Sequence, residues 1–149
     1  MTIPMNRDAL LIEDANGARE ALKNSRRLAI LGIKPEDHSA QPASYVPSAL
    51  QKMGWEIVPV PVYYPKVTEI MGQPVYRKLT DIPVDVDMVV VFRRPDDIPP
   101  HVQDIIAKRP KYVWFQLGIR NDEAAAELAA AGIAVIQDRC TMVEARYIR

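Results

Sequence analysis

The chain has a single cysteine, Cys140, among its 149 residues, so no disulfide bond can form within it. A lone thiol is typical of a protein kept in a reducing compartment, and we therefore expect a cytoplasmic protein. No run of about 18 consecutive apolar residues occurs, so we expect no membrane-spanning helix. The first residues also lack the apolar stretch and small-residue cleavage site of a secretory signal, so no signal peptide is expected.

An excess of either charge is also missing, because 19 lysines and arginines balance 19 aspartates and glutamates. Domains that bind DNA or RNA usually carry a basic surplus, so we expect no nucleic-acid partner, although a local basic pocket for one small anion is compatible with this balance. Hydrophobic residues make up 48% of the chain, which is typical of a folded domain. The length predicts one domain over 1–149, with an N-terminal helical segment at 1–25 and a core at 26–149.

Short apolar runs and helical patterns alternate along the chain. The runs predict five strands, at Arg27–Leu31, Glu56–Val60, Asp87–Phe92, Tyr112–Gln116 and Ile133–Gln137. The helical patterns cover Asp8–Asn24, Tyr45–Met53, Pro95–Lys108, Asn121–Ala131 and Thr141–Ile148. Residues 61–86 are irregular, with an extended piece at 73–76 and a turn near 78–81. This alternation predicts an α/β fold, with a doubly wound, parallel, five-stranded sheet and helices on both faces.

Ligands of open parallel sheets bind outside the carboxyl ends of the strands, at the point where the winding changes direction. The predicted strands place five segments there, namely Gly32–Ser44, Pro61–Lys66, Arg93–Pro95, Leu117–Arg120 and Asp138–Cys140. A binding site, if the chain has one, is expected among these segments.

The first of these segments runs from one glycine into a polar loop and then into a helix. Gly32 can adopt a positive φ and lets a ligand approach the backbone, although a tight turn alone would also require glycine. Ser44 can cap the following helix, whose free N–H groups attract phosphate. Lys34 and Asp37 stand where the G-x-G-x-x-G fingerprint has its second and third glycines, and no acidic residue follows the second strand. These departures argue against an ordinary NAD-dependent dehydrogenase, and the absence of a P-loop motif argues against a nucleoside triphosphatase.

Two adjacent arginines, Arg93 and Arg94, follow the third predicted strand. Guanidinium groups at that place can contact phosphates, and the alternative is that they pair with Asp96 or Asp97 on the surface. Adjacent side chains point in different directions, so we expect one of the two to face a ligand. Arg93 is favoured because it follows the strand directly.

Catalytic groups are few. His38 lies in the first loop without a partner at a recognisable spacing, and His101 is expected on the surface of a helix. Cys140 is either a reactive thiol or an inert small hydrophobic residue, and Asp138 is expected to pair with Arg139 or another arginine. No spacing of histidines and cysteines indicates a metal, so we predict neither catalytic residues nor a metal site.

Several segments resemble, as a set, the small stand-alone CoA-binding proteins of bacteria and archaea, which are similar to the CoA-binding domain of the succinyl-CoA synthetase α subunit. The matching segments are LAILGIKPEDHSAQPASYV, GQPVYRKLTDIP followed by VDMVVVFRRP, and W-x-Q-x-G-I-R followed by D-R-C. The resemblance extends over about Arg27 to Glu144, almost the whole chain. The resemblance implies a Rossmann-like sheet that binds coenzyme A at the carboxyl ends of its strands.

The same resemblance implies roles for particular residues. It places the backbone of Gly32, Ile33 and Lys34 and the helix start at Ser44 and Tyr45 near the pyrophosphate. It places Pro61, Val62 and Tyr63 by the adenosine end. Phe92, Arg93 and Pro95 would line the adenine or ribose, and Gln116 and Gly118 the path of the pantetheine.

We therefore expect a protein that binds coenzyme A or an acyl-CoA without catalysing a reaction, and no protein partner is indicated. The alternative is an enzyme that acts on an acyl-CoA with His38 or Cys140 in its site. A third interpretation, a different dinucleotide binder such as an NAD-sensing protein, is disfavoured by the missing glycines.

Overall fold

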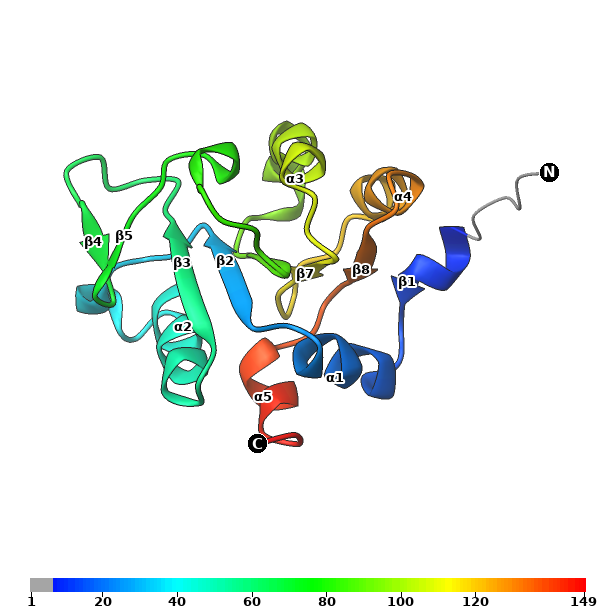
Figure 1. Ribbon diagram of the computed structural model, residues 1–149, viewed down its shortest axis with the longest axis horizontal. Helices are drawn as coiled ribbons and strands as arrows, with labels where there is room; N and C mark the ends of the chain where they lie inside the picture. The colour runs from blue at the N-terminus through cyan, green and yellow to red at the C-terminus, as the bar shows by residue number, and fades with distance from the viewer. Residues whose placement is uncertain (1–6) are drawn as a thin grey trace.

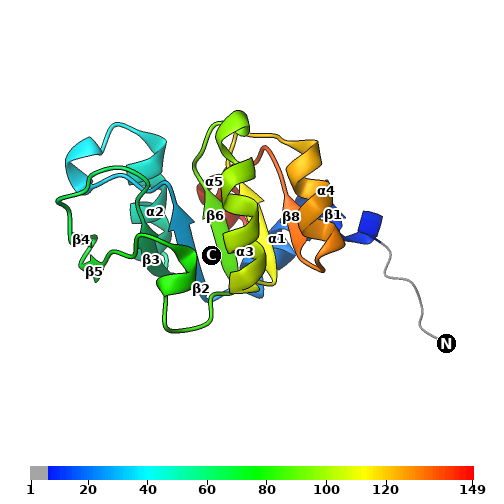
Figure 2. The ribbon, with the colours of Figure 1, turned by 90° about the horizontal axis from the view of Figure 1, so that it is seen from above.

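Six parallel strands form one sheet in the order β1-β8-β7-β6-β2-β3 (Figure 1). The structure is a computed structural model that describes residues 7–149. The strands are β1 (Leu11–Ile12), β2 (Arg27–Leu31), β3 (Glu56–Val60), β6 (Met88–Val91), β7 (Tyr112–Phe115) and β8 (Ala134–Ile136). A separate antiparallel pair, β4 (Glu69–Ile70) and β5 (Gln73–Pro74), lies beside the β3 edge (Figure 2).

Helices cover both faces of the sheet. They are α1 (Ala15–Lys23), α2 (Pro42–Lys52), α3 (Val102–Lys108), α4 (Asp122–Ala130) and α5 (Thr141–Ala145). In Figure 1, α3 and α4 lie above the sheet, and α1, α2 and α5 lie below it. Side chains of β2 alternate between these layers: Ala29 and Leu31 join the core on the α3 and α4 side, and Leu28 and Ile30 join the core on the other side. The doubly wound parallel sheet expected from the sequence is confirmed.

The sheet has one strand more than expected, because the N-terminal segment is not a single helix. Leu11 and Ile12 pair with Val135 and Ile136 of β8, and they point to opposite sides of the sheet. The helix begins only after Asp14, whose carboxylate accepts a hydrogen bond from the N–H of Gly17 at 3.3 Å. The helix predicted from Asp8 was therefore wrong in its first half. The start of the predicted segment at 1–25 lies outside the described residues.

The helix after β2 begins earlier than the sequence predicted. Pro42 is its first residue, where a missing N–H costs nothing and the fixed φ suits a helix. Ser44 is therefore inside the first turn and does not cap it. The buried hydroxyl of Ser44 instead donates to the carbonyl oxygen of Pro35 at 2.9 Å, which fastens the preceding loop to α2.

Prolines also shorten the helix predicted from Pro95. Two 3₁₀ turns, Pro95–Asp97 and Pro99–His101, precede α3, which starts only at Val102. Proline lacks the N–H that an α-helix needs after its first turn, so the clustered prolines delay the regular helix. Apart from β4, which was not predicted, the other helices and strands lie within a few residues of their expected places, and the turn at Leu79–Asp81 is present.

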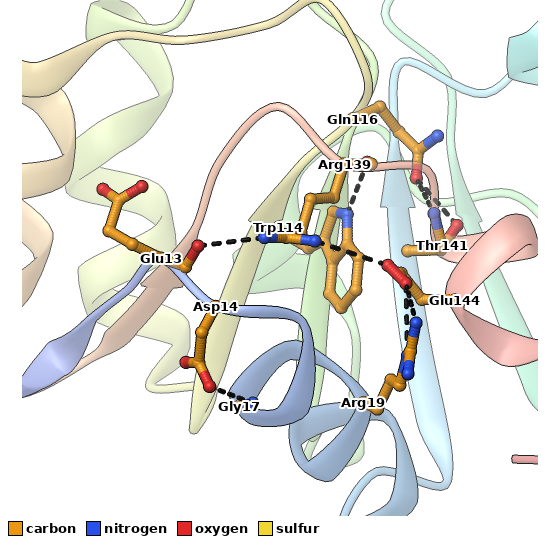
Figure 3. Close-up of polar contacts among 9 residues, drawn as sticks. All are labelled: Glu13, Asp14, Gly17, Arg19, Trp114, Gln116, Arg139, Thr141 and Glu144. Carbon is orange, nitrogen blue, oxygen red and sulfur yellow. Dashed lines mark hydrogen bonds and ion pairs between the residues drawn. The ribbon is translucent and has the colours of Figure 1, made fainter. Parts of the chain in front are cut away.

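A polar network joins the N-terminal segment to the chain after β8 (Figure 3). The indole N–H of Trp114 donates to the carbonyl oxygen of Arg139 at 2.8 Å, and the Arg139 guanidinium donates to the carbonyl oxygen of Glu13 at 2.9 Å. The buried carboxylate of Glu144 lies 3.5 Å from Arg139 and 3.3 Å from Arg19. These contacts hold the loop between β8 and α5 in one position.

The ends of β2 and β6 lie against each other at Gly32. Its φ is +88°, and a Cβ atom built there would lie 2.3 Å from the carbonyl oxygen of Phe92. Glycine is therefore required by the neighbouring strand as well as by its own backbone conformation. The two reasons considered from the sequence, a tight turn and the approach of a ligand, did not include this one.

Replacing Gly32 with alanine is expected to lower the free energy of unfolding by about 2–5 kcal/mol, because a strained φ and an overlap with backbone add together. The matched control is Gly72→Ala. Gly72 has a φ of +77° but nothing within 4 Å of its would-be Cβ. The control should lose only about 1–2 kcal/mol. Urea unfolding of both variants measures the difference, and equal losses would show that the contact with Phe92 is unimportant.

Candidate binding site at the strand ends

The winding of the sheet changes direction between β2 and β6, because β3 lies beyond β2 and β7 lies beyond β6. A cavity of about 540 Å³, here called the switch-point cavity, opens at the carboxyl ends of these strands. It is lined by Gly32, Lys34, Gln41, Pro42, Ala43, Tyr45, Val46, Phe92, Arg93, Arg94, Pro95, Gln116, Leu117, Gly118, Ile119 and Cys140. Its place is the one that parallel α/β sheets use for ligands.

Most of the residues proposed from the sequence line this cavity. They are Gly32, Lys34, Tyr45, Phe92, Arg93, Pro95, Gln116 and Gly118. Ile33 does not: it is buried in the core beneath α2. Pro61 and Val62 line a second cavity of about 210 Å³ that also contains His101 and Asp104. Tyr63 is 73% exposed and lines neither cavity.

No single-residue role was predicted for the part of the wall at the start of α2, which includes Gln41, Pro42, Ala43 and Val46, although the first three lie in the segment Gly32–Ser44 expected at the strand ends. The omission follows from starting the helix at Tyr45. Pro42 was the available signal, because proline is favoured at the first position of a helix. Leu117 and Ile119, on the loop after β7, lie in the expected segment Leu117–Arg120, but no role was predicted for either residue by itself.

Lys34 carries the cavity's uncompensated positive charge. Its ammonium group contacts the neutral side-chain oxygen of Gln41, and no carboxylate in residues 7–149 pairs with it. Unlike Lys34, the two arginines both lie near a carboxylate, that of Asp97: Arg94 at 3.0 Å and Arg93 at 4.0 Å. Both arginines line the cavity.

The arginines also differ in how deeply they are held. The Arg94 side chain is 88% exposed, whereas that of Arg93 is 28% exposed. The buried Nε atom of Arg93 has no hydrogen-bond partner within the described chain. That atom is enclosed, so Arg93 offers an anion the positive charge of its cavity-lining side chain and not this N–H.

The start of α2 gives the cavity a second attraction for anions. The backbone N–H of Ala43, in the first turn, has no acceptor among residues 7–149. Pro47, four residues later, has no N–H to donate to the Ala43 carbonyl oxygen. That oxygen instead accepts the backbone N–H of Lys34 at 3.0 Å. The loop that carries the cation is thereby fixed against the positive end of the helix dipole.

The opposite part of the wall is polar but uncharged. Gln116 is 4% exposed, and its side-chain oxygen accepts hydrogen bonds from the backbone N–H and the hydroxyl of Thr141, at 2.9 and 2.7 Å (Figure 3). The N–H of Gly118 donates to Asp138 at 2.6 Å. Asp138 therefore holds the β7 loop and does not pair with Arg139, whose partner is Glu144. The loops after β7 and β8 are joined as one unit.

The three residues considered for catalysis do not gather in one place. His38 packs against the ring of Tyr64, with 5.1 Å between ring centroids, and does not line the switch-point cavity. His101 is half-buried, lines the second cavity and lies just before α3. Cys140 lines the switch-point cavity. Among residues 7–149, no group of three or more His, Cys, Asp or Glu side chains is arranged to hold a metal ion.

The chain matches a known protein family over most of its length. Residues 26–146 match the CoA binding domain family. The uncharacterised protein YneT of Bacillus subtilis is 32% identical over 125 residues, which cover 84% of this chain and 89% of YneT. None of the helices in the described part of the chain has the length and hydropathy that a membrane span requires.

Solved structures give the same picture of the fold. A Thermus thermophilus protein is 34% identical, with a TM-score of 0.81, and the match covers 91% of this chain and 99% of that one. A dinucleotide-forming acetyl-coenzyme A synthetase from Candidatus Korarchaeum cryptofilum is 20% identical, with a TM-score of 0.64. That match covers 78% of this chain but only 26% of the synthetase. The fold therefore also occurs as part of a larger chain.

His101 makes stability depend on pH. Burial lowers the pKa of His101 below its usual 6.5, and nearby Arg93 lowers it further, although Asp104 and Asp97 oppose the change. The unfolded chain then takes up a proton at a higher pH than the folded chain does. The free energy of unfolding contributed by neutral His101 is complete above about pH 6.5 and is lost as the pH falls below that value.

We therefore expect the fall in unfolding free energy between pH 7.5 and 5.5 to be shallower in His101→Gln than in the parent. His38→Gln is the matched control, because it also removes one imidazole but keeps His101. Urea unfolding at several pH values measures the slopes. Parallel slopes in His101→Gln and the parent would contradict the assignment.

Proposed function

Because the chain belongs to the CoA-binding domain family, we propose that it binds coenzyme A or an acyl-CoA in the switch-point cavity and catalyses no reaction of its own. The proposal rests on one observation, which is that the same cavity has a positively charged part and an uncharged part. The first is an unpaired cation beside a helix N-terminus, and the second is a buried side-chain amide. Lys34 and Ala43 supply the first part, and Gln116 supplies the second. Coenzyme A has the matching division, with phosphates at one end and amide groups at the other.

The attraction between the protein and the phosphates must be short-ranged, because the chain has no net charge that would attract an anion from a distance. Lys34 offers a charge that no carboxylate in the described chain offsets. Arg93 offers a guanidinium held at the cavity wall only 4.0 Å from Asp97, with its Nε atom unpartnered among the described residues. A phosphate bound in the cavity would meet the charges of Lys34 and Arg93 without breaking a strong ion pair.

The proposal of binding without catalysis rests on the residues that line the cavity. They include Cys140, but no histidine, aspartate or glutamate that could serve as a general base beside it. The alternative is an enzyme that acts on an acyl-CoA, with Cys140 as nucleophile. His38 is less suited to that alternative, because it packs against Tyr64 away from the cavity wall. A turnover assay with several acyl-CoA thioesters, compared with Cys140→Ser, would decide for the enzyme if thioester cleavage depended on Cys140.

The proposal also covers the class of binding partner and the location of the protein in the cell. The partner is a small molecule, without nucleic acid or membrane, because the charge balance offers no basic surface for phosphate chains. A cytoplasmic location is proposed from the single cysteine, which suits a reducing compartment.

Coenzyme A and acetyl-CoA should stabilise the fold, whereas NAD should not. A ligand at about 100 times its dissociation constant adds about 2.7 kcal/mol to the free energy of unfolding, which raises the melting temperature by about 5–10 °C. NAD lacks its usual partners here, since Lys34 replaces a fingerprint glycine and Pro61, not an acid, follows β3. Thermal melts with each ligand test this, and a rise with NAD but none with either CoA species would overturn the proposal.

Removing the unpaired cation should weaken binding strongly. A charge-assisted contact to phosphate is worth about 1.5–3 kcal/mol, so Lys34→Gln should raise the dissociation constant for coenzyme A by about 10- to 150-fold. Arg93→Gln should also weaken binding, because its side chain is held at the cavity wall.

Arg94→Gln is the matched control for both variants. It removes the same charge from an exposed side chain that pairs with Asp97, so a change of less than about 5-fold is expected. Calorimetric titration measures all three variants. If Lys34→Gln and Arg93→Gln bind as tightly as the parent, the phosphates bind elsewhere.

A further inference from the structure

We propose that Cys140 is a site of covalent modification, which exchanges with bound coenzyme A disulfide and keeps one coenzyme A as a mixed disulfide. The inference rests on the proposed function and adds a reaction to it. Cys140 is the only cysteine of the chain and is partly exposed where it lines the switch-point cavity.

A second observation at the same wall points to a ligand. Gln116 is 96% buried, its exposed fraction being 4%, and its orientation is fixed because the backbone N–H of Thr141 can only donate. The side-chain oxygen of Gln116 must therefore face Thr141, and the amide nitrogen points the other way (Figure 3). No residue within 7–149 accepts a hydrogen bond from that nitrogen, and Gln116 lines the cavity. A carbonyl oxygen of a ligand is the partner this amide lacks.

The order of these groups along the sheet edge matches the order of groups along coenzyme A. Lys34 follows β2, Arg93 follows β6, Gln116 follows β7 and Cys140 follows β8. These strands are neighbours in the sequence β2-β6-β7-β8 across the sheet. Adjacent strands lie about 4.8 Å apart, so the ends of β2 and β7 that carry Lys34 and Gln116 are on the order of 10 Å apart. Cys140 lies just before α5, and its neighbour Thr141 is bonded to Gln116. A ligand laid along this edge meets cations first, an amide donor next and a thiol last, as phosphates, pantetheine amides and thiol succeed one another in coenzyme A.

The covalent step is a thiol–disulfide exchange. The Cys140 thiolate attacks one sulfur of the disulfide of coenzyme A and forms a new S–S bond with it. The other coenzyme A leaves as a thiolate and takes up the proton that Cys140 gave up. One disulfide is consumed and one is formed, so the step requires no further oxidant.

The experiment compares two disulfides with the same purified, reduced full-length protein. Intact-protein mass spectrometry without reductant follows the gain of one coenzyme A less two hydrogen atoms, or of one glutathione less two hydrogen atoms. Because binding holds the reacting sulfurs together, the folded protein should react about 100-fold faster with the disulfide of coenzyme A than with oxidised glutathione. In urea, where the cavity is absent, the two rates should be similar. Lys34→Gln should reduce the preference in the folded protein.

Calorimetry with reduced coenzyme A, in the presence of reductant, separates the two proposals. If reduced coenzyme A binds but the folded protein shows no preference between the disulfides, the modification site is refuted and the proposed function stands. If reduced coenzyme A does not bind and no preference exists, both proposals fail. If the preference persists in urea, it comes from a difference in reactivity between the two disulfides themselves, and the modification site is refuted.

Discussion

The contact between the ends of β2 and β6 is the constraint on which the binding face depends. Gly32 passes so close to the carbonyl oxygen of Phe92 that no side chain fits between them. The two strand ends therefore meet as bare backbone, and the chain then turns away in both directions toward α2 and toward α3. That divergence opens the switch-point cavity, and any bulk at this position would separate the elements that supply its cations.

The loop that carries Lys34 is held to α2 by a hydrogen bond that exists because Pro47 has no N–H. Pro47 leaves the Ala43 carbonyl oxygen without its helical donor, and the backbone of Lys34 fills the vacancy at 3.0 Å. Ser44 adds a second attachment through Pro35. A residue that weakens a helix in isolation thus becomes the means of attaching a loop to it. The result is a positively charged loop of fixed position, which loses little conformational freedom when an anion binds.

The sequence predicted the central sheet well, because strands buried on both faces are nearly all apolar and the turns between elements carry glycine or proline. It missed β1, since Leu11 and Ile12 can be fitted to a helical pattern as easily as to a strand of two residues. Within the site, Gly32 was proposed from its place at a strand end, whereas Gln116 was proposed only through the resemblance to the CoA-binding proteins. Pairing of Arg93 and Arg94 with Asp96 or Asp97 was one of two alternatives left open. The sequence could not show that both arginines lie near Asp97, because that depends on where the proline turns direct the chain. Nor could it show the burial of Ile33, which follows from packing beneath α2.

Arg149, the last residue of the chain, is held at the end of the sheet where the parallel strands begin, opposite the cavity. The guanidinium of Arg149 stacks on the ring of Trp55, 3.7 Å from its centroid, and donates to the carbonyl oxygen of Met53 at 2.9 Å. Trp55 immediately precedes β3, so this anchor lies where the parallel strands begin, while the cavity lies where they end. An affinity tag or a surface tether joined to this end of the chain would therefore point the cavity outward into solution, which makes it the suitable attachment point for immobilising the protein on a sensor.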